Sequence, residues 1–126
     1  MGTWGPGNFE NDYAWDVLLD AERPIKQAIQ AFVLSPNSGI EDLADLMAFL
    51  EIHIALIKYC GASPPGKSFL GKLRRKVLRI YDKEIDQLQP KASYKRRRRR
   101  VLVKTLELYG RAKTTRKMTT PFDKLD

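Results

Sequence analysis

Apolar residues recur every three or four positions along most of the chain, the spacing that places them on one face of an α-helix. The first such stretch follows Asn11 and includes Val17 and Leu18. Pro24 interrupts this stretch, and proline lacks the backbone donor that a helix interior needs. We therefore expect Pro24 to lie in the first turn of a second, short helix over residues 24–33.

The longest apolar stretch begins after residues 35–39, whose Ser, Pro, Asn and Gly indicate a loop. It is apolar on nearly all sides, a pattern typical of a helix at the centre of a bundle. Gly61 is suited to end this helix, because glycine readily adopts the left-handed conformation that follows many helices. The pattern predicts a central apolar helix over about residues 40–60.

Two amphipathic segments follow, over about residues 68–88 and 94–111. In the second of them, Leu102, Leu106 and Tyr109 are expected to face inward. The helical segments together predict an all-α fold, a single compact bundle of about four or five helices around the central one.

The domain limits follow from where this periodicity begins and ends. Residues 1–112 are expected to form one helical domain. Residues 113–126 show no helical spacing and are expected to form a C-terminal tail.

The composition excludes several classes of protein. A length of 126 residues suffices for one hydrophobic core, and a single Cys excludes a disulfide within the chain. One Cys and one His supply too few zinc ligands, so we expect no metal and no cofactor. The sequence has neither an apolar run of about 18 residues nor a secretory signal at its start. A cytoplasmic protein with no membrane interaction is therefore expected.

Charge is distributed unevenly along the chain. The formal net charge is +8, yet residues 1–60 carry three basic and nine acidic side chains, whereas residues 61–126 carry 20 basic and six acidic ones. A surplus of one sign attracts partners of the opposite sign and raises their association rates. The C-terminal half is therefore the candidate interaction region.

Two rows of cations in this half have helical spacing, and the second belongs to a run of six cations from Lys95 to Arg100. If the two helices are antiparallel neighbours, the rows can merge into one basic surface. The candidate binding residues are Lys72, Lys76, Arg79, Lys83, Arg96, Arg97, Arg100 and Lys104. Three interpretations remain open: a solvated face, a surface for an acidic protein partner, and a surface for nucleic acid bound without sequence specificity.

A second motif, from Gly61 to Ser68, matches the phosphate-loop pattern G-x-x-x-x-G-K-[ST]. A phosphate loop needs a strand before it and backbone donors around the phosphates. Here Pro64 and Pro65 remove two donors, and the preceding segment has the pattern of a helix. We therefore expect a loop between helices and no nucleotide. In a phosphate-binding alternative, Lys67 and Ser68 would be the critical residues.

No catalytic constellation is visible in the sequence. His53 lies on an apolar side of the central helix, where a partly buried histidine with one hydrogen-bond partner is expected. Cys60 is interpreted as a small apolar filler rather than a nucleophile. No catalytic residue is therefore assigned, and the protein is not expected to be an enzyme.

The first 16 residues carry a motif of closely spaced glycines, aromatic residues and acids. The glycines permit a tight backbone, and the two large aromatic side chains are costly to leave exposed. We therefore expect an ordered Gly-rich lasso over residues 1–10 that folds back onto the bundle. The structural motif comprises Trp4, Gly5, Gly7, Phe9, Asn11, Asp12 and Asp16.

This motif resembles the start of a bacterial family, domain of unknown function 4259, which opens with M-G-x-W-G-x-G-x-F-x-N-D-x-A-x-D-W. Ala14 also matches the family pattern, whereas Val17 stands where the family usually has Trp. The resemblance covers about the first 17 residues. It implies a small helical bacterial protein without an established activity, and relatives look similar to immunity proteins of bacterial toxin systems.

These observations predict a non-enzymatic protein-binding module whose basic C-terminal surface meets an acidic protein partner. By the resemblance, that partner could be a toxin. The alternative prediction is a nucleic-acid-binding protein that uses the same surface.

Overall fold

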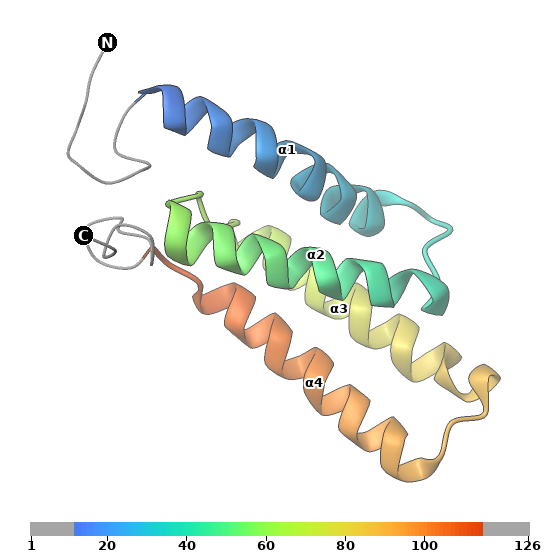
Figure 1. The fold of residues 1–126 in the computed structure, drawn as a ribbon. Coiled ribbons are helices and arrows are strands. Elements are labelled where there is room, and N and C mark those ends of the chain that lie inside the picture. The colour runs from blue at the N-terminus through green and yellow to red at the C-terminus, as the bar shows by residue number, and fades with distance from the viewer. Residues whose placement is uncertain (1–11, 115–126) are drawn as a thin grey trace.

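The structure is a computed structural model, and it describes residues 12–114, most of which belong to four α-helices (Figure 1). Three short helical segments extend these helices or lead into them. The elements in chain order are α1 (Asp12–Leu34), η1 (Ile40–Asp42), α2 (Leu43–Ala55), η2 (Leu56–Cys60), α3 (Lys67–Glu84), η3 (Ile85–Leu88) and α4 (Ala92–Arg111). No strand occurs among the described residues, so the predicted all-α bundle is confirmed.

Consecutive α-helices run antiparallel (Figure 1). Helix α2 packs along α1 on one side and α4 on the other, and α3 packs against α4 and α1. Helical backbone continues from Ile40 to Cys60 through η1, α2 and η2, which confirms the predicted central helix. The π-helical turn η2 ends at Cys60 and is followed by Gly61, whose φ of 87° lies in the left-handed region.

The core lies where the four helices meet and is formed by aliphatic side chains from each of them. Leu50 and Ile57 of the central segment, Leu73 of α3 and Leu102 of α4 are fully enclosed. The outer face of α2 is open to solvent and includes Ile52. Much of the apolar pattern on that face comes from three alanines, whose small side chains expose little apolar surface.

The prediction of a helix break at Pro24 is wrong, because α1 continues through it from Asp12 to Leu34. Pro24 is exposed, whereas Glu22 and Ile29 are buried on the face toward the bundle. Packing of that face stabilises the helix on both sides of the proline. Tertiary contacts therefore outweigh the local cost of the missing donor.

The remaining sequence predictions lie partly outside the described residues. The Gly-rich lasso over residues 1–10 lies outside them, as does residue 115 onward of the predicted tail. Within residues 12–114, no helix has both the length and the apolar character needed to cross a membrane.

Candidate functional site

Helices α3 and α4 carry the predicted basic rows, and seven of the eight candidate cations are exposed. Within residues 12–114, none of these seven makes a salt bridge. We call this surface the basic face; it comprises Lys72, Arg79, Lys83, Arg96, Arg97, Arg100 and Lys104. The charges of these side chains are therefore not offset by an ion pair among the described residues.

Lys76, the eighth candidate, has a different role. Its Nζ donates to the carbonyl oxygen of Val33 at 2.9 Å and also to that of Ser35. These carbonyls lie at the C-terminal end of α1, where helical partners are lacking. Nζ also lies 5.7 Å from the ring centroid of Phe32. Lys76 therefore attaches α3 to the end of α1 and is not part of the basic face.

One ion pair joins α3 and α4 beside the basic face. The Nε and Nη2 atoms of Arg99 donate to the two carboxylate oxygens of Asp82 at 2.9 and 3.0 Å. The hydrogen bond from Arg99 lowers the pKa of Asp82 below its usual value. Because Asp82 follows Arg79 by one helical turn and Arg99 follows Arg96 by another, the two cation rows flank this pair.

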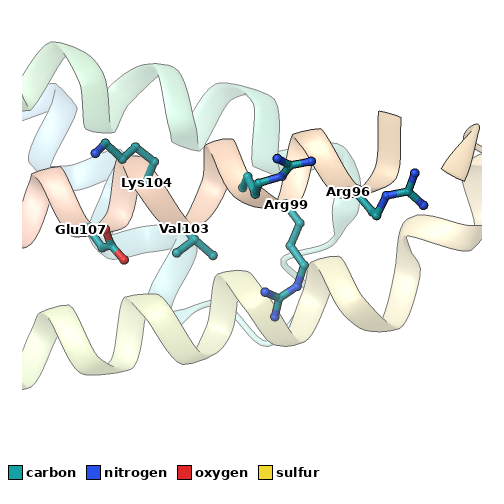
Figure 2. A pocket seen from close by; sticks show the side chains of 6 residues that line it. Arg96, Arg99, Val103, Lys104 and Glu107 are labelled. Carbon is teal, nitrogen blue, oxygen red and sulfur yellow. The ribbon is translucent and has the colours of Figure 1, made fainter. Parts of the chain in front are cut away.

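A surface groove of about 610 Å³ runs along α4 (Figure 2). Its lining residues are three or four positions apart and so belong to one helical face: Arg96, Arg99, Arg100, Val103, Lys104 and Glu107. Arg99 reaches toward α3, and Val103 lies between Arg99 and Glu107 (Figure 2). The lining of the groove therefore combines four cations with one apolar side chain and one acid.

A separate polar cluster lies inside the bundle and joins three helices. Nε2 of His53 on α2 lies 2.6 Å from a carboxylate oxygen of Glu22 on α1, and Nδ1 lies 2.7 Å from the hydroxyl oxygen of Tyr109 on α4. The three residues are 4, 1 and 2% exposed in the order Glu22, His53, Tyr109. Burial, with a smaller contribution from the Glu22 charge, raises the pKa of Tyr109.

This cluster is more extensive than the sequence predicted, because His53 has two partners and is fully buried. A signal for it was present in Glu22, which follows Leu18 by four residues and precedes Ile29 by seven on the inward stripe of α1. A carboxylate at such a position requires a polar partner, and the sequence contains a single histidine.

A pocket of about 290 Å³ adjoins the buried cluster, and His53 and Tyr109 belong to its lining. All four α-helices contribute to the pocket, together with Ser63 and the following residues of the loop between η2 and α3. The loop belongs to the segment that matches the phosphate-loop pattern. The residues before it are π-helical, and Lys67 and Ser68 lie in the first turn of α3, so the strand that a phosphate loop needs is not there.

Cys60, at the end of η2, is half-buried. Burial raises the pKa of its thiol, which keeps the sulfur protonated and weakens it as a nucleophile. Among residues 12–114, no group of three or more His, Cys, Asp or Glu side chains is arranged to hold a metal ion.

The N-terminal motif can be placed only in part. Asp12 and Asp16 lie in the first turns of α1, whereas Trp4, Gly5, Gly7, Phe9 and Asn11 lie outside the described residues. No family model, curated protein or solved structure matches the chain. The resemblance to domain of unknown function 4259 therefore stays a prediction from the motif.

Proposed function

We propose that this chain is a non-enzymatic binding protein whose basic face engages an acidic protein partner. The observation that carries the proposal is the set of seven exposed cations on α3 and α4, none of which makes a salt bridge within residues 12–114. Such a surplus of charge favours rapid, salt-sensitive encounter with an acidic surface.

The charge of the basic face is not used to hold the bundle together. In the described part of the C-terminal half, Arg99 pairs with Asp82 and Lys95 with Asp86, so both pairs stay within that half. In the N-terminal half, the Arg23–Asp20 pair is local and the His53–Glu22 pair is buried. None of these pairs joins an acid of the N-terminal half to a cation of the basic face.

The groove on α4 favours a protein partner over nucleic acid. Val103 and Glu107 line it together with its cations, and Arg99 of the lining is paired with Asp82. The phosphates of a nucleic acid repel acidic side chains on the surface that binds them. Protein interfaces, by contrast, combine arginine, apolar groups and both signs of charge. An immunity protein that binds a toxin fits this description, in agreement with the resemblance at the N terminus.

The proposal is tested by affinity capture from the native host with and without nuclease, followed by measurement of the affinity for the captured protein. In the test variant Arg96, Arg100 and Lys104 are replaced by Gln; in the matched control Arg23, Lys67 and Lys113 are replaced, which are exposed cations outside the basic face. We expect the test variant to weaken binding at least about tenfold and the control about twofold or less.

Other results would contradict the proposal. Capture that is lost after nuclease treatment, with salt-dependent retardation of random DNA or RNA, would establish the nucleic-acid alternative. Equal affinities of the two triple variants would show that the basic face is only a solvated surface. Self-association in light scattering, abolished by the test variant alone, would identify the acidic surface as a second copy of the chain.

A further inference from the structure

The pocket beside the buried cluster has walls of two kinds. Its polar wall includes the exposed side chains of Lys26 and Gln30 on α1, and its apolar wall includes Ile29 and Phe69. His53 and Tyr109 close its inner end, because both line it and yet are almost fully buried. A polar inner end, an apolar wall and a cation at the rim are features of a small-molecule site.

We propose that this pocket binds a small organic anion, a carboxylate carried by an apolar group, with Tyr109 as hydrogen-bond donor and Lys26 as counter-charge. The proposal does not depend on the basic face, which lies on other parts of the bundle.

The charge of the lining selects an anion. Lys26 is a formal cation, and none of the described residues that line the pocket is a carboxylate. Glu22 lies on the far side of His53 and is engaged by Nε2 at 2.6 Å. A negative ligand group therefore meets a cation and a hydroxyl donor.

The size and the apolar wall select the rest of the ligand. A volume of about 290 Å³ has room for about ten groups the size of a water molecule. Ile29, Phe69 and the two prolines of the loop offer contacts to a ring or a branched chain. Pro64 and Pro65 offer no backbone donors, so this wall is poorly suited to a free phosphate, which needs several.

The hydroxyl of Tyr109 belongs to the buried cluster and also lines the pocket. Its oxygen lies 2.7 Å from Nδ1 of His53, and Nε2 of the same ring lies 2.6 Å from a carboxylate oxygen of Glu22. A tyrosine hydroxyl can both donate and accept, so where Nδ1–H donates to its oxygen, its own hydrogen is available to a bound carboxylate.

The experiment uses the full chain and phenylacetate as the probe, with its neutral isostere phenylacetamide and inorganic phosphate as comparisons. Calorimetry gives the affinity of the chain for each of the three compounds. We expect phenylacetate to bind about tenfold more tightly than phenylacetamide.

Three variants locate the site. Tyr109→Phe is expected to weaken the binding of phenylacetate about tenfold. Lys26→Gln, on the exposed rim, is expected to weaken it about threefold without affecting the fold. Lys67→Gln is the matched control, because Lys67 belongs to the phosphate-loop pattern and does not line the pocket; its affinity should equal that of the unchanged chain.

Several results would overturn the proposal. Equal affinities for phenylacetate and phenylacetamide would show that the pocket does not select an anion. The absence of saturable binding of both compounds would also contradict the proposal. A folded Tyr109→Phe variant that binds phenylacetate as tightly as the unchanged chain would exclude the role of Tyr109. Phosphate binding that Lys67→Gln weakens and Lys26→Gln does not would instead identify a phosphate loop. If Tyr109→Phe does not fold, Lys26→Gln and the comparison of acid with amide still decide the outcome.

Discussion

His53 on α2 and Glu22 on α1 are 31 positions apart in the chain, yet their side chains meet at 2.6 Å in the interior of the bundle. The contact fixes the rotation of α1 and α2 about their axes, because it requires each helix to present one particular side chain to the other. Nδ1 of the same ring extends the contact to Tyr109 and thus to α4.

Replacing Glu22 by Ala is expected to destabilise the protein strongly. The change leaves Nε2 of His53 buried without an acceptor, and loss of one partner of a buried pair typically costs about 3 kcal/mol or more. Glu22→Gln keeps an acceptor oxygen and should cost less, about 1 kcal/mol. Urea denaturation measures both, with the exposed Asp20→Ala as control. A Glu22→Ala variant as stable as that control would contradict the structural role of the cluster.

Tyr109 is expected to make the stability of the fold decrease at alkaline pH. Burial and the charge of Glu22 raise the pKa of Tyr109, so its neutral form is favoured in the folded chain. This stabilisation is fully present below the pKa of tyrosine in the unfolded chain, about 10, and is lost as the pH rises above that value. Thermal unfolding across this range should show a steeper decline for the unchanged chain than for Tyr109→Phe. Identical declines would show that Tyr109 does not contribute.

Replacement by Met is expected to affect fold stability at Lys76 and partner binding at Lys72, although the two residues are one helical turn apart on α3. Lys76→Met removes the hydrogen bonds to the carbonyls of Val33 and Ser35 and should destabilise the fold by about 1–2 kcal/mol. Lys72→Met should leave the free energy of unfolding within about 0.5 kcal/mol of that of the unchanged chain. It should instead weaken the affinity for the captured partner. Denaturation and binding measured on both variants check this. The reverse pattern would place Lys76 in the basic face.

The sequence determined the helices more reliably than their side-chain partners. The predicted segments 40–60, 68–88 and 94–111 agree with the helical segments of the structure to within about two residues, because their apolar stripes are long and regular. Pro24 misled the prediction because a local rule about backbone donors does not include the packing of the rest of α1.

The candidate site was predicted in part for a related reason. Spacing along one helix correctly placed seven cations on the outside, but spacing could not reveal that Lys76 faces the end of α1. The contacts of His53 depend on the rotation of three helices, which no local pattern specifies. Long-range polar pairs are therefore the part of the site for which coordinates were needed.

Removing the guanidinium of Arg99 is expected to change the titration of Asp82. The hydrogen bond from Arg99 lowers the pKa of Asp82, so the ion pair stabilises the fold above the unfolded value of about 3.9, and this contribution is lost as the pH falls through the lowered value. In Arg99→Ala the pKa of Asp82, followed by NMR of the carboxyl carbon, should rise. Because both side chains are partly exposed, the loss of stability should not exceed about 1 kcal/mol. An unchanged titration would show that the two side chains do not pair in solution.

Pro24→Ala is expected to stabilise the protein, because α1 is continuous through this position. Alanine restores the backbone N–H that can donate to the carbonyl of Asp20, and proline in a helix interior costs about 3 kcal/mol relative to alanine. Part of the gain is offset by the greater conformational freedom of the unfolded variant, which leaves an expected net increase of about 1–2 kcal/mol. Urea denaturation measures the change, and Ala21→Pro in the preceding turn, which removes a donor instead of restoring one, should shift the midpoint in the opposite direction. A Pro24→Ala variant that is less stable than the unchanged chain would instead favour a break in α1 at this residue.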